Sequence, residues 1–264
     1  GMRTVMPDGK IRARGVAMAM QGSSISNCDV GSVTVKLSDE GTYHITVGCT
    51  DMGTGCDTII AQFAADVLET PIDNISVYGV DTDISPYDSG SYASSTTYLT
   101  GMAAVKACEQ LREHIIALAA ARMNKDASAL TFDGENVIDE SDGSKMSLFD
   151  IATASMCNNE ISMEVTYSHS SPVSPPPFMA ACAEVEVDPE TGAIELLDYT
   201  ACVDCGTVVN TNLARVQTEG GLLQGIGMTL YEDIWYDERG KNLSNSFMQY
   251  KVPSRLDTDL SLIH

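Results

Sequence analysis

The stretch Gly31-Ser-Val-Thr-Val-Lys-Leu-Ser-Asp-Glu-Gly-Thr-Tyr-His-Ile-Thr-Val47 alternates apolar and polar residues on both sides of a short run of turn formers. Alternation with a period of two is typical of half-buried strands, so this stretch predicts a β-hairpin with its turn at 38–41. A glycine-rich loop follows at 48–55, and apolar residues then recur at helical spacing from 59 to 68. Residues 31–68 therefore predict the order strand, turn, strand, loop, helix.

The same order of elements returns later in the chain. Residues 183–187 and 193–199 alternate around the turn Asp188-Pro-Glu-Thr-Gly192, and a helical pattern follows from 212 to 230. This repetition fits an internal duplication, and it equally fits one common supersecondary unit that is used twice.

Three further segments have clear patterns. Residues 74–80 predict a strand, 97–123 a long alanine-rich helix, and 148–157 a shorter helix. Helices and strands are interleaved, yet the strands include hairpins. The predicted fold class is therefore α+β, with two lobes that each contain a mixed sheet and hairpins packed by helices.

A proline-rich segment, Ser-Ser-Pro-Val-Ser-Pro-Pro-Pro at 170–177, marks the boundary between the lobes. Proline fixes φ and removes a backbone donor, so regular structure is excluded there. We expect a first lobe at 1–169, a linker at 170–178 and a second lobe at 179–264. Gly1 before Met2 resembles a tag remnant, and the sequence stops in mid-pattern at His264. We therefore expect a piece of a longer chain, with the second lobe truncated.

The composition narrows the class of protein. The 264 residues are 44% hydrophobic and 20% charged, which is ordinary for a globular protein, but the formal net charge is −22. Nucleic acid and anionic membranes would be repelled, so we expect neither as a partner and interpret the acidity as a solvated surface. No signal peptide or membrane-spanning run is visible, and the eight cysteines have mostly apolar neighbours. Reduced thiols in a cytoplasmic protein are the expectation.

Three loops contain residues that could bind a ligand. In Asp51-Met-Gly-Thr-Gly55, two glycines precede a helix, so backbone N–H groups and the helix N-terminus could approach an anion. The loop lacks the lysine of a P-loop and the third glycine of a dinucleotide-binding turn, and for the motif alone a tight turn without a ligand is the favoured interpretation. A phosphate-ligand enzyme is accordingly a weak alternative.

The second loop, Asp88-Ser-Gly-Ser-Tyr-Ala-Ser-Ser-Thr-Thr97, is dense in hydroxyl groups directly before the long predicted helix. Helix capping would need only one or two of them, so the rest favour a cradle for a polar anionic ligand. The third stretch, Gln217-Thr-Glu-Gly-Gly-Leu-Leu-Gln-Gly-Ile-Gly227, places four glycines in a helical pattern. Glycine in a helix interior lowers helix stability, so four glycines here indicate that something approaches the backbone closely, either another helix or a cofactor.

Metal and nucleophile motifs are weak. Cys202-Val-Asp-Cys205 has the spacing of zinc ligands but no second pair, and the aspartates at 81–88 do not have calcium-loop spacing. The four histidines are scattered, and no nucleophile elbow is present. No metal-ligating residue is therefore predicted.

The three loops in this order resemble those of the large, molybdopterin-binding subunit of the xanthine dehydrogenase and aldehyde oxidase family, in its C-terminal part. The matching stretches are Val47–Gly55, Ser91–Thr97, Val203–Asn210, Gln217–Gly225 and Tyr250–Pro253. The family stretches are similar to Gly-Gly-Thr-Glu-Met-Gly-Gln-Gly, a small-residue loop, Asp-Cys-Gly…Asn-Pro, Gln-x-Glu-Gly…Gln-Gly and Tyr-Lys-Ile-Pro. The likeness extends from about residue 15 onward, and the order of the motifs is its strongest part.

The resemblance implies a molybdenum cofactor, bound through a molybdopterin with or without a dinucleotide extension. Gly53, Thr54 and Gly55 would lie near the pterin or the metal, and Gln217 would contact the pterin end. Ala93, Ser94, Ser95 and Thr96 would hydrogen-bond the pterin or its phosphates. The implied reaction is hydroxylation of a purine, an N-heterocycle or an aldehyde with water as the oxygen source. Electrons would pass to 2Fe-2S clusters and FAD on partner subunits or domains.

Some positions depart from the family pattern. Asp51 replaces a common Glu, Thr54 a common Gln that reaches toward the metal, and Thr211 a common Pro. The family's catalytic glutamate belongs to a Gly-Glu-Pro-like stretch, so we expect that base beyond residue 264 and assign no catalytic residue here. The isolated chain is therefore expected to be inactive. The alternative hypothesis is a cofactor-free acidic interaction module on the same scaffold.

Overall fold

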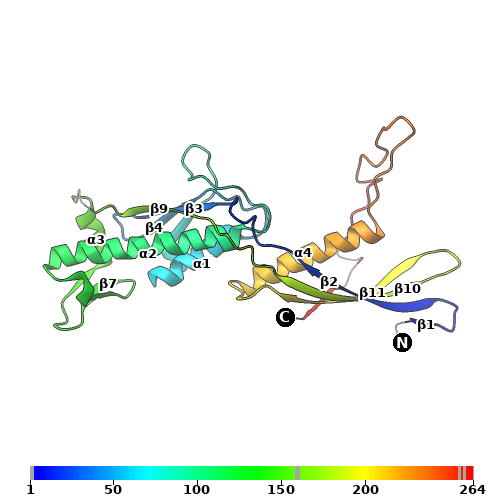
Figure 1. Ribbon diagram of the computed structural model, residues 1–264, viewed down its shortest axis with the longest axis horizontal. Coiled ribbons are helices and arrows are strands. Elements are labelled where there is room, and N and C mark those ends of the chain that lie inside the picture. Colours follow the sequence, from blue (N-terminus) through cyan, green and yellow to red (C-terminus); the bar gives the residue numbers. More distant parts are fainter. Residues whose placement is uncertain (1–2, 158–160, 255–256, 258–259, 264) are drawn as a thin grey trace. The chain divides into compact units, whose positions relative to one another are not determined.

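The computed structural model describes residues 3–157, 161–254, 257 and 260–263, and it divides the chain into two compact units. The central unit comprises residues 22–175, and the terminal unit combines residues 1–21 with 176–264. Figure 1 shows the helices and strands of both units. Three sheets and four α-helices are described, so the predicted α+β class is confirmed.

A four-stranded mixed sheet forms the framework of the central unit. Its order is β5 (Ile75–Tyr78), β4 (Tyr43–Val47), β3 (Gly31–Leu37) and β9 (Glu164–His169), and only β4 and β5 pair in parallel. The predicted hairpin is confirmed as β3 and β4, with Val35 opposite Ile45. A 3-10 turn, Ile72–Asn74, precedes β5, which is shorter than the strand predicted at 74–80.

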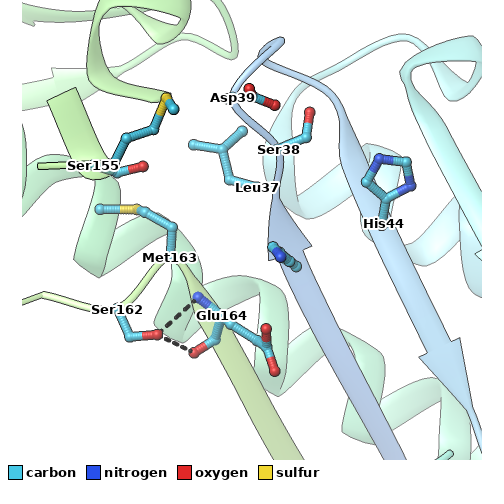
Figure 2. Close-up of a pocket in the computed structure, with 10 residues that line it drawn as sticks. Leu37, Ser38, Asp39, His44, Ser155, Ser162, Met163 and Glu164 are labelled. Carbon is cyan, nitrogen blue, oxygen red and sulfur yellow. Dashed lines mark hydrogen bonds between the residues drawn. The ribbon is translucent and has the colours of Figure 1, made fainter. Parts of the chain in front are cut away.

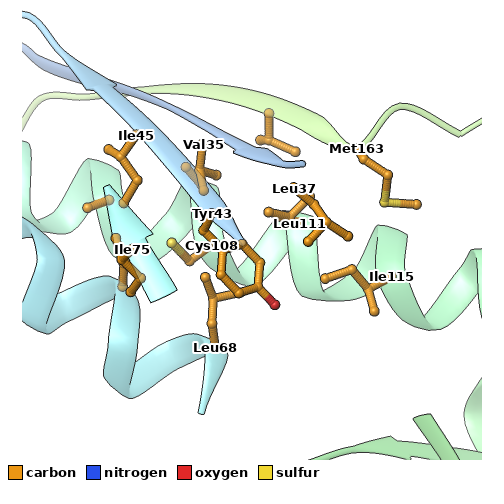
Figure 3. Packing of buried hydrophobic residues seen from close by; sticks show 14 of the residues in the cluster. Val35, Leu37, Tyr43, Ile45, Leu68, Ile75, Cys108, Leu111, Ile115 and Met163 are labelled. Atoms are coloured by element: carbon orange, nitrogen blue, oxygen red, sulfur yellow. The ribbon is translucent and has the colours of Figure 1, made fainter. Parts of the chain in front are cut away.

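Two helices cover one face of this sheet. They are α1 (Cys56–Leu68) and α2 (Thr96–Met123), and they agree closely with the helices predicted at 59–68 and 97–123. Every second residue of β3 and β4 is buried against them, which explains the alternation in the sequence. Figure 3 shows Tyr43, Cys108 and Leu111 packed together between sheet and helix.

The remaining elements of the central unit are short. A 3-10 turn, Ala127–Ala129, precedes a three-stranded sheet. The strands of this sheet are β6 (Leu130–Phe132), β7 (Asn136–Asp139) and β8 (Lys145–Ser147), and helix α3 (Leu148–Ser155) follows β8. Ser147 caps α3 by accepting the N–H of Asp150.

In the part of the terminal unit that the structure describes, a five-stranded sheet is accompanied by one helix. The strand order is β1 (Arg3–Val5), β2 (Ile11–Met20), β10 (Phe178–Val187), β11 (Ile194–Asp204) and β12 (Leu260–Ile263). Only β11 and β12 pair in parallel. Helix α4 (Thr211–Leu230) contributes the buried Leu222, which packs with Ala181 and Ala201. The second predicted hairpin and the helix at 212–230 are thereby confirmed, and the element order repeats as expected.

The arrangement of the N-terminal residues differs from the expected first lobe at 1–169. Residues 11–20 form β2, which pairs along its whole length with β10, so this segment belongs to the terminal unit. The physical reason is the ladder of main-chain hydrogen bonds, which places Met20 opposite Phe178. The proline-rich residues 170–177 form no regular element, in agreement with the sequence, and β10 begins at Phe178, within the expected linker at 170–178.

Aspartates close many of the turns. In each case a side-chain oxygen accepts the backbone N–H of the residue two positions later, which is the geometry of an Asx turn. The aspartates that do this are Asp8, Asp51, Asp81, Asp88, Asp126, Asp133, Asp139, Asp142, Asp188, Asp204 and Asp237. Part of the acidity therefore has a structural role in addition to solvation.

Candidate functional site

The loop between β4 and α1 folds around its own carboxylate. Asp51 Oδ1 accepts the N–H of Gly53 at 2.9 Å and that of Gly55 at 3.1 Å. Partial burial acts to raise the pKa of Asp51, but hydrogen bonds from these backbone N–H groups hold that pKa below its ordinary value. The two N–H groups that the sequence offered for a ligand are thus already occupied by the chain's own anion.

Gly53 and Gly55 both require glycine for conformational reasons. Their φ angles are 104° and 75°, in the left-handed region that residues with a Cβ rarely adopt. No described atom lies within 4 Å of the place where a Cβ on Gly53 would stand, so its outer side is open. Thr54, between them, is half-buried. The loop can therefore present backbone and one hydroxyl to a ligand at its outer side.

The hydroxyl-rich loop lies against the glycine loop. Ser91 Oγ accepts the N–H of Thr50 at 3.0 Å and donates to the carbonyl of Thr50 at 2.7 Å. Asp88 supports the same loop, because it accepts the N–H of Gly90 at 2.8 Å and the hydroxyl of Thr100 at 3.0 Å. The structure therefore brings together two of the three stretches that the sequence singled out.

The residues before α2 leave its N-terminus without a side-chain cap. Ala93 and Ser94 are left-handed, with φ of 52° and 55°, and Ser95 follows in the right-handed helical region. Ser95 Oγ donates to the carbonyl of Tyr92 at 2.8 Å and does not cap the helix, which begins at Thr96. A left-handed residue followed by a right-handed one makes a concave arrangement of N–H groups, and the dipole of a 28-residue helix adds positive potential there. This geometry favours an anion.

Ser24 contributes to the same region, although no motif in the sequence indicated this residue. Its N–H donates to the carbonyl of Ala93 at 2.8 Å, and its own carbonyl accepts the hydroxyl of Ser174 at 2.8 Å. Its φ is 100°. Ser24 Oγ is buried and has no hydrogen-bond partner among the described residues. An orphaned buried hydroxyl beside this loop is the kind of group that a polar ligand would satisfy.

Gln217 lies in α4 of the terminal unit and is exposed. Asn210 caps that helix by accepting the N–H of Leu213 at 3.0 Å. No described atom would lie within 4 Å of a Cβ added to Gly220, Gly221 or Gly225, whereas a Cβ on Gly227 would meet Pro253. Close approach within the described chain therefore explains only the last of the four glycines.

A cluster of two aspartates and a cysteine lies at the start of α1, and its arrangement can be explained without a metal ion. Asp51, Cys56 and Asp57 bring one ligand atom each to within 4.8 Å of one another. Cys56 Sγ lies 3.7 Å from Asp57 Oδ1, and burial and the nearby Asp51 raise the pKa of Asp57. The helix N-terminus and the N–H groups around Asp51 favour negative charge and oppose a cation. Internal hydrogen bonds account for this group.

A shallow cavity of 690 Å³ lies at the other end of the β3–β4 hairpin (Figure 2). Its lining includes Lys36, Asp39, His44, Met163 and Glu164. None of the residues predicted to bind a cofactor contributes to it. Lys36 stands opposite both His44 and Glu164 in the sheet register, so these three polar side chains share one face of the central sheet.

Known protein families and solved structures share this architecture. The model of the molybdopterin cofactor-binding domain matches residues 3–259. The probable hypoxanthine oxidase XdhD of Escherichia coli is 36% identical over 241 residues, which cover 91% of this chain and 25% of that protein. Subunit gamma of the 6-hydroxypseudooxynicotine dehydrogenase complex of Paenarthrobacter nicotinovorans is 29% identical, with 94% of this chain and 32% of that protein covered.

Solved structures agree. A Cu,Mo-CO dehydrogenase matches with a TM-score of 0.85 at 25% identity, over 96% of this chain and 34% of the other. Quinoline 2-oxidoreductase from Pseudomonas putida matches with a TM-score of 0.86 at 25% identity, over 97% and 35%. The chain thus spans about a quarter to a third of these relatives. In the described residues, no helix is both long and apolar enough to cross a membrane. The chain belongs to the molybdopterin cofactor-binding domain family of xanthine dehydrogenase and CO dehydrogenase large subunits.

Proposed function

We propose that this chain is the cofactor-binding part of a molybdenum hydroxylase large subunit. The observation that carries the proposal is the pair of loops joined by Ser91 and Thr50, set at the uncapped N-terminus of α2 within the family match. A family match alone would be compatible with a scaffold that had lost its ligand. The loops add an open glycine, a concave set of N–H groups and a buried hydroxyl without a partner.

These residues fit a molybdopterin. Ala93, Ser94, Ser95 and Thr96 would hold its phosphate or pterin groups through the start of α2. Gly53, Thr54 and Gly55 would lie closer to the metal end, with the Thr54 hydroxyl in the position of the family's glutamine. Gln217 would contact the pterin from the terminal unit. When bound, the cofactor supplies two-electron oxidation of a carbon centre, with water as the oxygen source.

The role of this chain's residues would be to bind and orient, not to move protons. We propose that the base is a glutamate outside the 264 residues and that 2Fe-2S and FAD partners accept the electrons. Three relatives support a multi-subunit assembly by their names, which call them a complex subunit, a large subunit and a large chain. The substrate would be a purine, an N-heterocycle or an aldehyde, and the assembly would act in the cytoplasm. The chain alone would be inactive.

A cofactor-free interaction module is the second candidate, and one specific observation favours it. Asp51 already fills the N–H groups of Gly53 and Gly55, and Thr54 replaces the residue that would reach the metal. A loop whose own carboxylate satisfies its N–H groups needs no ligand in order to fold.

Molybdenum and pterin analysis distinguishes the two candidates. The chain is produced in a host that makes the cofactor, alone and together with the other portions and subunits of its hydroxylase. We expect molybdenum and oxidisable pterin in the assembly and none in the chain alone. Gly53→Val should remove the cofactor from the assembly, whereas Gly143→Val, at a solvent-exposed turn whose φ is also left-handed, should not. An assembly that forms without molybdenum would favour the interaction module.

A further inference from the structure

Left-handed backbone is concentrated beside the candidate site. Six of the described residues other than glycine have a φ between 52° and 100°. Two of them are the C-caps of α1 and α2, where this conformation is common. The other four lie in the loops at 22–30 and 88–95, and they are Ser24, Asn27, Ala93 and Ser94. A residue with a Cβ keeps this conformation only where its surroundings hold it there, so these two loops are tightly constrained.

Asp29 is a buried carboxylate that bonds both loops. The residue is only 1% exposed, and aspartate is seldom buried to this extent without hydrogen-bond partners. Its Oδ2 accepts the N–H of Ile25 at 2.7 Å, within its own loop. Its Oδ1 accepts the hydroxyl of Tyr92 at 2.7 Å, 63 residues further along the chain. Each carboxylate oxygen therefore holds a different loop, and Tyr92 directly precedes the left-handed pair Ala93 and Ser94.

Tyr92 connects this carboxylate to the start of α2. Because the residue is 46% exposed, its ring packs only partly, and the hydroxyl bond to Asp29 supplies a directed contact. The carbonyl of Tyr92 accepts the N–H of Ser95 at 3.2 Å and the Ser95 hydroxyl at 2.8 Å. The left-handed pair Ala93 and Ser94 thus lies between two fixed points, namely the Asp29 carboxylate on one side and the first turn of α2 on the other.

The loop that contains Asp29 is itself anchored at both ends. The N–H of Val30 donates to Ser89 Oγ at 2.8 Å, and the N–H of Ser89 donates to the carbonyl of Val30 at 2.9 Å. The N–H of Asn27 donates to the carbonyl of Ser171 at 2.9 Å. These bonds give the Asp29 carboxylate a fixed position, which is what a residue needs if it is to orient another part of a site.

We propose that Asp29 and Tyr92 are positioning residues of the candidate site. Their hydrogen bond holds Ala93 and Ser94 in the left-handed conformation that forms the concave arrangement of N–H groups before α2. The arrangement is then already in place when an anionic group binds, so binding does not have to supply the free energy of ordering this segment. The nature of the bound group rests on the proposed function, whereas the conformational role of the pair depends on this chain alone.

A second hydroxyl bonded to a buried aspartate provides a matched control. Ser141 Oγ donates to Asp139 Oδ1 at 2.5 Å, and Asp139 is 3% exposed. This pair lies in the turn between β7 and β8, outside the loops that are expected to bind the cofactor. Tyr92→Phe and Ser141→Ala each remove one hydroxyl from a buried aspartate of the central unit. Only Tyr92→Phe should alter the candidate site if the bond to Asp29 has a positioning role.

The first test is amide hydrogen exchange in this chain without cofactor. Tyr92→Phe should accelerate exchange at residues 93–97 by about tenfold or more, because the released segment can leave the left-handed conformation. Asp29→Asn keeps one acceptor oxygen and should have a smaller effect at the same amides. Ser141→Ala should leave residues 93–97 unchanged. Equal exchange rates at these amides in wild type and Tyr92→Phe would overturn the proposal, whatever group the chain binds.

The second test is retention of molybdenum by the assembly with the other portions and subunits of its hydroxylase. Loss of molybdenum after dilution should be about tenfold faster in Tyr92→Phe than in wild type or Ser141→Ala. Adding Ala93→Gly and Ser94→Gly to Tyr92→Phe should restore much of the retention, because glycine adopts the left-handed conformation without a Cβ penalty. Unchanged retention in Tyr92→Phe, or a loss that the glycines do not reverse, would refute the positioning role. A wild-type assembly without molybdenum would instead overturn the proposed function, and the exchange experiment then decides the role of Asp29 and Tyr92.

Discussion

The Ser91 hydroxyl bonds both main-chain polar groups of Thr50, accepting its N–H at 3.0 Å and donating to its carbonyl at 2.7 Å. One hydroxyl thereby joins two loops that are 41 residues apart in the sequence. The candidate site depends on this junction, because it is a direct side-chain link between the glycine loop and the hydroxyl-rich loop that leads into α2.

Replacing Ser91 with Ala should loosen both loops at once. Loss of two hydrogen bonds is expected to lower the free energy of unfolding by about 1–2 kcal/mol. Hydrogen exchange should accelerate at residues 50–55 and 91–95 together. Ser76→Ala, at an exposed serine of β5, is the control and should change neither. Acceleration confined to residues 91–95 would contradict the role of Ser91 as a junction.

Asp51 should determine the conformation of the glycine loop. Asp51→Ala removes the acceptor of the Gly53 and Gly55 N–H groups, so the exchange of these two amides is expected to accelerate by about tenfold or more. Asp51→Asn retains one acceptor oxygen and should have a smaller effect. Asp66→Ala, at an exposed position of α1, is the control. Equal exchange rates in wild type and Asp51→Ala would show that the loop is held by other contacts.

Gly48 should be intolerant of any side chain. A Cβ at this position would meet the carbonyl of Pro86 and the Asp88 side chain, which belong to the segment that leads into the hydroxyl-rich loop. Gly48→Ala is expected to lower the free energy of unfolding by about 1–3 kcal/mol through overpacking. Gly15→Ala, where no atom lies within 4 Å of the new Cβ, is expected to be close to neutral. Urea denaturation measures both, and equal values would show that the Pro86 segment yields without cost.

Loss of the hydroxyl group should change the stability of the central unit in opposite directions at two tyrosines. Tyr43 Oη is buried without a partner among the described residues, and burial raises the Tyr43 pKa. Tyr43→Phe should therefore stabilise the central unit by about 1 kcal/mol. Tyr98 Oη is 2.9 Å from Ser171 Oγ, so Tyr98→Phe should destabilise by a similar amount. A loss of stability in Tyr43→Phe would indicate a water partner for its hydroxyl.

Acid should destabilise the protein through its aspartate turns. Hydrogen bonds to Ser128 hold the pKa of Asp126 below its ordinary value, and the N–H groups of Asn136 and Glu135 do the same for Asp133. A carboxyl whose folded pKa is lowered contributes stability that is complete above the unfolded value, about 4, and is lost as the pH falls through the folded value. Denaturant midpoints should therefore decline below about pH 4.

A variant that lacks one of these carboxyl groups tests the cause of this decline, because its stability should depend less steeply on pH. Asp133→Asn should lower stability at pH 7 and flatten the acid limb, because the variant cannot take up a proton at that position. Ser76→Ala, at the exposed serine of β5, should leave the limb unchanged, because this substitution removes no titrating group. An identical limb in wild type and Asp133→Asn would assign acid unfolding to other groups.

The sequence predicted the elements that carry regular patterns. The hairpin at 31–47 and α2 were predictable because alternation and helical spacing reflect burial on one face. The strand β2 was not predicted, since alanine and methionine are weak strand formers and its partner, β10, lies more than 150 residues away. The strands β6, β7 and β8 were too short, at three or four residues, to show a period.

The candidate site was predictable as composition but not as geometry. Glycine and hydroxyl density indicated the loops at 51–55 and 88–97, and the order of the motifs indicated the family, which the comparisons confirm. The role of Asp51 as the loop's own anion and the orphaned hydroxyl of Ser24 depend on three-dimensional contacts that no local pattern encodes. The assignment of Gln217 and the part that each lobe plays in binding a cofactor remain predictions.

The aspartate turns restrict how this protein can be re-engineered. A redesign that reduces the net charge by converting surface aspartates to neutral residues would open turns such as those at Asp133 and Asp188, because each oxygen accepts a backbone N–H. Glutamate has one more methylene and does not reproduce this short-range geometry, so Asp-to-Glu exchanges there are not conservative. Neutralising exposed glutamates is the tolerant route, and a homologue that is less acidic should differ first in its glutamates.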